Sequence, residues 1–498
     1  MSSPPASVSA SPDPNQRVIP RPSQRRLSSA RAPGRPRYIQ AGENLFITSG
    51  PTPAVAGAAG DEPEGGASWP TATLRVLGVL GGIGAGIAFG ALGLFERADT
   101  AAGLVVAPLL VVLAASLIEK FVRPRVGEFV AAVALAGLGA RMIGAVPRLL
   151  SGADATVYQR EGVRISDSLL ALNFGVDPGR AVPGTGTVRY FSGIVNVFTG
   201  GSYVITFLIF ATIAFVGQVL LLLALQPVLS RKQMRAFVVL VMFSPTMVYW
   251  PSSIGKESLV LFGIGLSFFG VSRLYDRNWS GIVPALLGGL AVGLIRPHVA
   301  MLLLAGLAVG LLARNSRTQR KLAVHLVVLT LFVIGAMLAT GASARLFNLE
   351  SFDGIADVSA ALDFTEERTT QDASGFTAAR VNSFVDYPRA VVTVLFRPFV
   401  WEASGVPAMV SAIEGVGLAA LTFFATGGIL SQIKTIASRS QLLFAFGYTS
   451  IFIFVFAAIG NFGILSRQRA QVIPFVLLLI AVGIGAERFG NRRGSTSP

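Results

Sequence analysis

Five basic residues stand in the segments between long apolar runs: Lys256, Arg296, Arg397, Arg467 and Arg469. A guanidinium group can bind a phosphate through two parallel hydrogen bonds, and an ammonium group binds it as a point charge. His298 lies two residues beyond Arg296, and a histidine titrates near neutral pH. These residue types predict a site for an anionic group, provided that the fold brings them to one face.

Three carboxylates accompany these cations. Asp154 and Tyr158 are four residues apart, so on a helix they share a face, and such an Asp can act as general base toward an acceptor hydroxyl. Glu257 follows Lys256 directly. Glu402 lies in the aromatic stretch "LFRPFVWEAS" (395–404), which combines a carboxylate with rings of the kind that contact sugars. We therefore predict Asp154, Glu257 and Glu402 as candidate catalytic residues.

The composition indicates a membrane protein. Of 498 residues, 52% are hydrophobic and 13% are charged, whereas soluble proteins carry roughly 25% charged residues. A net charge of +15 is typical of basic cytoplasmic loops in such a chain, so no nucleic-acid partner is expected. With no cysteine and two histidines, a thiolate or multi-histidine metal site is excluded. We predict no metal and no cofactor, although carboxylates leave Mg²⁺ or Mn²⁺ open.

The apolar runs predict an all-α, polytopic membrane helix bundle, because about 20 apolar residues cross the hydrocarbon as a helix. About twelve runs are expected as spans, some of them short: 72–94, 100–118, 128–146, 203–228, 235–250, 257–273, 280–295, 297–313, 321–343, 407–429, 441–459 and 470–486.

The orientation follows from the connecting segments. With the basic N-terminus in the cytoplasm, the inner loops include "EKFVRPRVGE" (119–128), "SRKQMR" (230–235) and "RNSRTQRK" (314–321). These loops are short and basic, as the positive-inside rule requires. We therefore expect a multi-pass protein of the cytoplasmic membrane with both termini inside. The predicted outer side then carries Lys256, Arg296, Arg397, Arg467 and Arg469.

Three regions follow from this topology. Residues 1–70 are predicted to form a disordered, basic cytoplasmic tail, with binding to anionic lipid as an alternative. Residues 71–486 form the transmembrane domain, with large outer loops at 147–202 and 344–406. Residues 487–498 form a basic cytoplasmic tail. Such long loops are usually functional or disordered, and the piece at 395–404 is expected to lie on the interface or to re-enter the membrane.

The stretch "WPSSIGKES" (250–258) is expected to be an outer hairpin. Trp250 is predicted as an interfacial anchor, and Pro251 ends the preceding helix. Ser252 or Ser253 is expected to cap the next helix, with Glu257 in its first turn. Helix mechanics leave Lys256 unexplained, but it lies beside a helix N-terminus, a setting that attracts phosphate.

Three stretches resemble bacterial membrane proteins of surface-polysaccharide assembly. Asp154–Tyr158 (D-x-x-x-Y) resembles the acidic start of the first outer loop in GT-C-type glycosyltransferases. "FSPTMVYWPSSIGKESL" (243–259) and "GNFGILSRQRAQVIPFVLLL" (460–479) are similar to segments of transferase-like and O-antigen-polymerase-like proteins. The paired acids of many GT-C loops are absent, because Ala153 and Ala155 flank Asp154, and the Asp follows the third span rather than the first. A polymerase is therefore equally compatible.

The resemblance implies a polyprenyl-phosphate- or polyprenyl-diphosphate-linked saccharide as substrate, presented on the outer face. It implies Asp154 as base and Lys256, Arg467 and Arg469 as phosphate contacts, joined on charge and sidedness by Arg296 and Arg397. Membrane lipids are further partners, and the N-terminal tail is a candidate contact for other glycan-assembly proteins. Two alternatives remain: a transporter or flippase of a lipid-linked or anionic solute, and a non-enzymatic scaffold.

Overall fold

The structure, a computed structural model, describes residues 71–95, 98–151, 153–312 and 375–486. These residues all belong to one unit, Gly66–Pro498. Within the described ranges the regular structure is helical, apart from an isolated bridge between Gly375 and Asn461. The all-α prediction is thereby confirmed for this part of the chain. Both predicted tails, the predicted span 321–343 and residues 344–374 of the loop at 344–406 lie outside the described residues.

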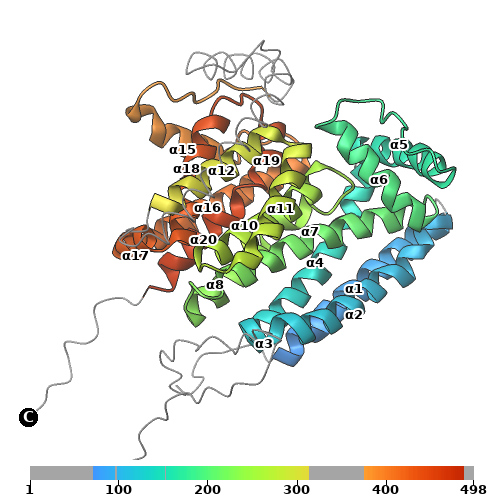
Figure 1. Ribbon diagram of the computed structural model, residues 1–498, viewed down its shortest axis with the longest axis horizontal. Coiled ribbons are helices and arrows are strands. Elements are labelled where there is room, and N and C mark those ends of the chain that lie inside the picture. Colours follow the sequence, from blue (N-terminus) through green and yellow to red (C-terminus); the bar gives the residue numbers. More distant parts are fainter. Residues whose placement is uncertain (1–70, 96–97, 152, 313–374, 487–498) are drawn as a thin grey trace, which may run out of the picture. The chain divides into compact units, whose positions relative to one another are not determined.

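The first half of the chain carries these helices in order (Figure 1): α1 (Thr71–Phe95), η1 (Ala98–Ala102), α2 (Gly103–Leu117), η2 (Ile118–Val122), α3 (Arg123–Val126), α4 (Glu128–Ser151), α5 (Ala153–Leu170), α6 (Thr185–Thr199), α7 (Tyr203–Leu225), α8 (Arg231–Phe243) and α9 (Pro245–Tyr249). The second half carries α10 (Lys256–Tyr275), η3 (Trp279–Gly281), α11 (Ile282–Ile295), α12 (Pro297–Leu312), η4 (Phe384–Asp386), α15 (Tyr387–Phe396), α16 (Val406–Ser431), α17 (Ile433–Ser438), α18 (Ser440–Phe456), α19 (Phe462–Arg469) and α20 (Ile473–Ile484).

The protein is a multi-pass helical membrane protein. Among the described residues, five helical stretches are long and apolar enough to cross a membrane: Gly103–Val126, Glu128–Leu150, Tyr203–Leu225, Lys256–Tyr275 and Pro407–Ser431. A sixth is added if α19 and α20, which meet at an angle of 61°, form one broken span. Four shorter apolar helices accompany them: Arg75–Ala91, Trp279–Ile295, Pro297–Leu311 and Ser440–Phe456.

The predicted spans correspond to these helices with some differences. The run 235–250 is divided at Ser244 into α8 and α9. The runs 280–295, 297–313 and 441–459 are helices shorter than a full membrane crossing. The described part of the chain thus shows five or six candidate spans, and the total of about twelve stays a prediction.

Small residues allow the central helices to approach closely. A Cβ atom added at Gly265 of α10 would lie 2.1 Å from the carbonyl oxygen of Gly217 in α7, so only glycine fits there. Close backbone approach at small residues is a common way of packing membrane helices, where the hydrophobic effect does not drive association. Around this crossing, the rings of Phe268, Phe444 and Phe475 pack together in the core. The crossing therefore fixes α10, whose first turn forms part of the site below.

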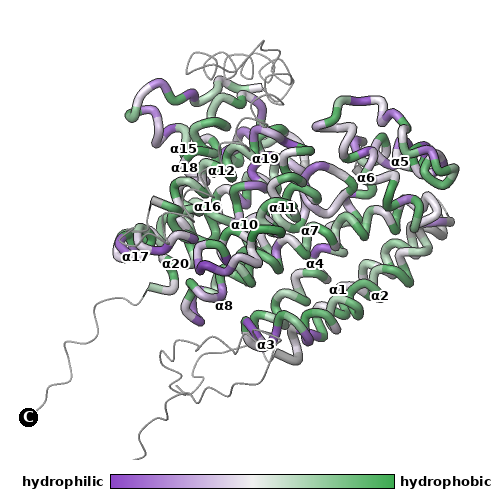
Figure 2. The backbone as a smooth tube through the Cα atoms, viewed as in Figure 1, coloured by the Kyte–Doolittle hydropathy of each residue, from purple (hydrophilic) through white to green (hydrophobic). Residues whose placement is uncertain are grey.

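Polar segments gather at the ends of the helices (Figure 2). Figure 1 shows α3, α8 and α17 toward one end of the long helices, and α5, α6, α15 and α19 toward the other. The first group contains the basic segments predicted to be cytoplasmic. The second group contains the segments predicted to be outer. The predicted loop at 147–202 is largely helical, since α5 and α6 pack against each other as a hairpin.

Candidate functional site

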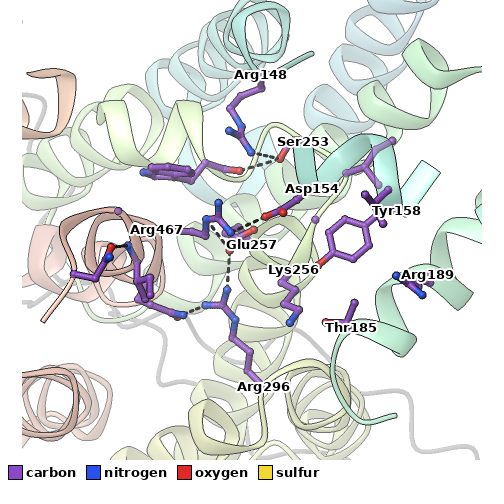
Figure 3. A pocket seen from close by; sticks show the side chains of 18 of the residues that line it. Arg148, Asp154, Tyr158, Thr185, Arg189, Ser253, Lys256, Glu257, Arg296 and Arg467 are labelled. Carbon is purple, nitrogen blue, oxygen red and sulfur yellow. Dashed lines mark hydrogen bonds and ion pairs between the residues drawn. The ribbon is translucent and has the colours of Figure 1, made fainter. Parts of the chain in front are cut away.

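A cavity of about 980 Å³ lies among α4, α5, α6, α10, α19 and the segments at 250–255 and 296 (Figure 3). Its lining includes two carboxylates, Asp154 and Glu257, and six basic side chains: Arg148, Arg180, Arg189, Lys256, Arg296 and Arg467. The structure thus gathers five of the nine predicted site residues, drawn from separate parts of the chain. The excess of positive charge makes the cavity suited to an anion.

The segment that carries Lys256 is shaped by a break in the preceding helix. Pro245 follows the end of α8, and the Glu414 carboxylate of α16 accepts hydrogen bonds from the Ser244 hydroxyl (2.5 Å) and the Thr246 backbone amide (3.0 Å). A carboxylate at this position satisfies backbone donors that a helix start leaves without partners. Glu414 therefore stabilises the point at which α9 begins.

A buried arginine holds the other end of α9. Arg141, in the middle of α4, is 1% exposed. Its guanidinium donates to the Gln218 side chain and to the Met247 carbonyl, both at 2.6 Å. Gln218 in turn donates to the Val241 carbonyl at 2.7 Å. These donors satisfy carbonyls that the interrupted helix leaves open, as a buried break requires.

Residues 250–255 form a buried turn, which corrects two expectations. Neither Ser252 nor Ser253 caps α10, because Gly255 occupies the cap position without a side-chain bond. The serine hydroxyls instead donate back to the carbonyls of Val248 and Trp250. Trp250 is 9% exposed and therefore does not anchor the chain at the lipid interface. Glu257 does stand in the first turn of α10, as predicted.

Two ion pairs cross the cavity (Figure 3). Arg296 Nη2 lies 2.7 Å from Glu257 Oε1, and these side chains are 6% and 8% exposed. Arg467 Nη1 lies 2.8 Å from Asp154 Oδ2, with 38% and 60% of the side chains exposed. Arg467 Nε is also 4.0 Å from Glu257 Oε1. Glu257 therefore orients both arginines, whereas Asp154 remains open to solvent.

Lys256 differs from these arginines because it makes no hydrogen bond or ion pair with the described residues. It begins α10, where the backbone amides and the helix dipole also favour an anion. Tyr158 lies beside it in Figure 3. Burial, together with Glu257 and Asp154, raises the pKa of the Tyr158 phenol, while a hydrogen bond with Thr185 works against the rise. Tyr158 is therefore a neutral donor at physiological pH.

Three of the lining arginines were not among the predicted residues. Arg148, at the end of α4, donates to the Ser253 hydroxyl at 3.3 Å and stacks against the rings of Tyr249 and Trp250. Arg189 of α6 donates to the Pro178 carbonyl at 2.9 Å, and Arg180 is exposed. All three lie within the predicted outer loop at 147–202. Their sidedness was therefore a signal that the sequence already carried.

Four predicted site residues do not line the cavity. Arg397 and Glu402 pair with each other, with Arg397 Nε 3.1 Å from both carboxylate oxygens, and the Arg397 guanidinium lies over the rings of Phe376 and Phe462. This pair lines a separate cavity of about 490 Å³ beside α15. Residues 397–404 form a turn, and their expected position at the interface stays a prediction.

Arg469 and His298 are the other two. Arg469 is 1% exposed and donates to the carbonyls of Val394 and Arg397. It fixes α19 against α15, so its cationic group faces backbone oxygens. His298 lies at the start of α12, and its ring centroid is 6.1 Å from that of Phe456. Phosphate binding by either residue stays a prediction, which this placement does not favour.

The Arg397–Glu402 pair predicts a pH dependence. Burial works to raise the pKa of the Glu402 carboxyl, but hydrogen bonds from Arg397 and the Phe399 amide hold that pKa below its usual value. A depressed pKa contributes stability that is present above the unfolded-state pKa and is lost as pH falls through the folded-state pKa. We expect the unfolding temperature of the wild type to fall on acidification more steeply than that of Glu402→Gln. If the unfolding temperatures of the two proteins fall equally steeply with decreasing pH, this account is contradicted.

The residue types of the cavity suit an oxyanion better than a metal. Within the described ranges, no three His, Asp or Glu side chains gather as a metal site requires. Two arginines, a lysine and a helix N-terminus converge instead, as they do around phosphate. No protein-family model, curated protein or solved structure matches the chain, so the functional argument rests on the chemistry of this cavity.

Proposed function

We propose that this protein is a membrane glycosyltransferase or polysaccharide polymerase that acts on polyprenyl-phosphate- or polyprenyl-diphosphate-linked saccharides. The reaction takes place at the outer face of the cytoplasmic membrane, in cell-surface glycan assembly. The observation that carries the proposal is the cavity in which six basic side chains surround two carboxylates at the ends of membrane-spanning helices. A lipid-linked phosphate lies at this depth, with its charge at the helix ends and its tail in the hydrocarbon.

The proposed division of labour follows the contacts. Lys256, Arg296 and Arg467 bind the phosphate group. Lys256 makes no hydrogen bond or ion pair with the part of the chain that the structure describes, and carboxylates hold the two arginines in place. In the transfer, an acceptor hydroxyl attacks the anomeric carbon, and the bond from that carbon to the phosphate oxygen breaks. The cations stabilise the charge that develops on the leaving phosphate.

Asp154 is the base in this proposal. Its side chain is 60% exposed and forms an ion pair with Arg467, one of the cations proposed to bind the phosphate. It accepts the proton of the acceptor hydroxyl, a role that contributes roughly 100- to 10,000-fold in enzymes. Glu257 is a positioning residue, since its carboxylate is buried against Arg296. Glu402, paired with Arg397 beside another cavity, takes no part in the transfer.

The complete topology belongs to the same proposal: about twelve spans, with both termini in the cytoplasm. It is supported by the position of α3, α8 and α17, whose basic residues lie at the end of the helices away from α5, α6 and α19 (Figure 1). The positive-inside rule places such segments in the cytoplasm. The cavity then opens on the outer side, where the lipid-linked saccharide is presented.

One observation favours the alternative of a transporter. Arg141 is a buried charge in the middle of the spanning helix α4, and such residues often mark transport pathways. Its partners, however, are Gln218, the Met247 carbonyl and the Ser252 hydroxyl, which hold the broken helix in place. These contacts give Arg141 a structural role, so the transporter remains the second candidate.

The experiment is the lipid-linked glycan profile of cells that lack this protein, complemented with the wild type, Asp154→Asn or Asp167→Asn. Asp167 lies on the same helix and is exposed, but it does not line the cavity. We expect a lipid-linked saccharide to accumulate in the deletion strain and in Asp154→Asn, and the long glycan to return with the wild type and Asp167→Asn. An unchanged profile in the deletion strain would refute the proposed function.

A further inference from the structure

Helix α6 buries three polar side chains and exposes two large apolar ones. Arg189, Ser192 and Asn196 are 9%, 0% and 1% exposed. On the opposite side, Ile194 is 41% and Phe198 is 83% exposed. This is the reverse of the arrangement that water imposes on a surface helix. An environment that is itself apolar accounts for it.

The polar side of α6 is satisfied within the protein. Gln159 of α5 donates to the Asn196 side chain and to the Gly201 carbonyl, both at 2.8 Å, and Asn196 donates to the Ser192 carbonyl at 2.8 Å. The two helices approach closely at Gly162, where an added Cβ would lie 2.4 Å from the Ser192 hydroxyl. This network pairs the amide and hydroxyl groups of Gln159, Ser192 and Asn196, so the helix can turn them inward.

Both ends of α6 are tied to helices of the membrane region. Before its start, the Gly184 amide donates to the Leu294 carbonyl at 2.8 Å, near the end of α11. After its end, a short turn leads into α7 at Tyr203. In between, the ring of Phe191 contacts that of Phe210, with the ring centroids 5.6 Å apart. Phe210 lies seven residues after the start of α7 at Tyr203, which corresponds to about 10 Å along the helix. Helix α6 therefore packs against the first turns of the spanning helix α7.

Helix α5 covers the other side of α6 and presents charges instead. Its exposed positions include Asp154, Arg160, Arg164 and Asp167. Figure 1 shows α5, α6 and α7 following one another at the same end of the molecule, and each adjacent pair is in contact. The hairpin thus has a charged layer formed by α5 and an apolar layer formed by α6.

We infer that α6 is an interfacial helix, immersed in the lipid at the membrane boundary where α7 begins, with Ile194 and Phe198 in contact with acyl chains and α5 facing water. The partner is the lipid surface itself, as for other helices that lie in the interface plane. The polar face of the same helix carries Arg189 and Thr185 into the cavity (Figure 3). Helix α6 is thus the wall between the cavity and the lipid. This assignment is independent of the reaction that the protein performs.

The chain lacks cysteine, so single cysteines can be labelled without further changes. Full-length Phe198→Cys, Ile194→Cys and, as the control on α5, Arg160→Cys are labelled with an environment-sensitive fluorophore and reconstituted in phosphatidylcholine vesicles. Arg160 has a side-chain exposure of 76% and Phe198 an exposure of 83%, so neither label disturbs packing. Emission is compared in ordinary lipid, in lipid with brominated acyl chains, and with aqueous iodide.

We expect the labels at 194 and 198 to show blue-shifted emission, to lose most of their intensity in brominated lipid and to resist iodide. The label at 160 should show the reverse. Quenching of the 198 label by iodide but not by brominated lipid would overturn the assignment and place α6 in water. Protection of that label from both quenchers would also overturn it, since a protein partner would then cover the helix.

Discussion

Arg467→Ala is expected to abolish most of the proposed transfer while the protein remains folded. The Arg467 side chain is 38% exposed and links Asp154, Glu257 and the Trp250 ring at the mouth of the cavity. In the proposed reaction, its removal takes away a cation that stabilises the leaving phosphate and the residue that pairs with the proposed base, Asp154. Loss of one such preorganised group costs on the order of 100- to 1,000-fold in rate. The measurement is saccharide transfer by the reconstituted full-length protein from a lipid-linked donor.

The matched control is Arg164→Ala, which removes an exposed arginine of α5 that pairs with Glu161 and does not line the cavity. Arg467→Lys should fall between the wild type and Arg467→Ala, because it keeps the charge but loses the bidentate geometry. Equal rates for Arg467→Ala and Arg164→Ala would remove Arg467 from the site.

The second large effect concerns the stability of the buried pair Arg296–Glu257. Replacing either residue alone by leucine leaves its partner charged and buried, and breaking such a pair costs about 3–5 kcal/mol. Replacing both by apolar residues removes the uncompensated charge and is often neutral. We expect Glu257→Leu and Arg296→Leu each to lower the unfolding temperature markedly. The double variant Glu257→Leu/Arg296→Met should recover most of that loss in a thermal melt of the solubilised protein.

A transfer assay distinguishes the contribution of the Arg296–Glu257 pair to stability from the phosphate binding proposed for Arg296. The double variant should stay inactive although it is stable, because the cavity has lost Arg296, one of the cations proposed to bind the phosphate. Gln468 also accepts a hydrogen bond from Arg296 and loses that donor in every Arg296 variant, so Gln468→Ala measures this part of the effect separately. Single variants that melt like the wild type would show that the pair is not a buried ion pair in the folded protein.

The sequence predicts those features of the fold and the site that depend on hydropathy and on the membrane side of each loop (its sidedness). The apolar runs indicate helices, and the predicted outer position of Lys256, Arg296 and Arg467 indicates a shared face. Sidedness alone, however, does not say which way a side chain points. It therefore also selected Arg397 and Arg469, whose guanidinium groups are bound by Glu402 and by backbone carbonyls. Their partners come from tertiary packing, which no local pattern records.

The buried turn at 250–255 illustrates the same limit. Its sequence suggests an exposed hairpin with a serine cap, because Trp, Pro and Ser are common at interfaces and helix starts. The turn is buried since Arg141 and Glu414, from α4 and α16, satisfy the ends of α9. Glu414 and Arg141 are distant in sequence from that turn. Their effect on it becomes visible only when the helices are packed.

The most direct test of the central claim, that the cavity binds a lipid-linked phosphate, is ligand-induced thermal stabilisation of the full-length protein. The probe is a short-chain polyprenyl diphosphate, with the corresponding polyprenol as the uncharged control. A ligand that binds only the folded state stabilises it by about 2.7 kcal/mol at 100 times its Kd. We predict a saturable rise in unfolding temperature for the wild type and for Arg164→Ala, and none for Arg467→Ala or Lys256→Ala. No rise in the wild type, or the same rise in all four proteins, would contradict the claim.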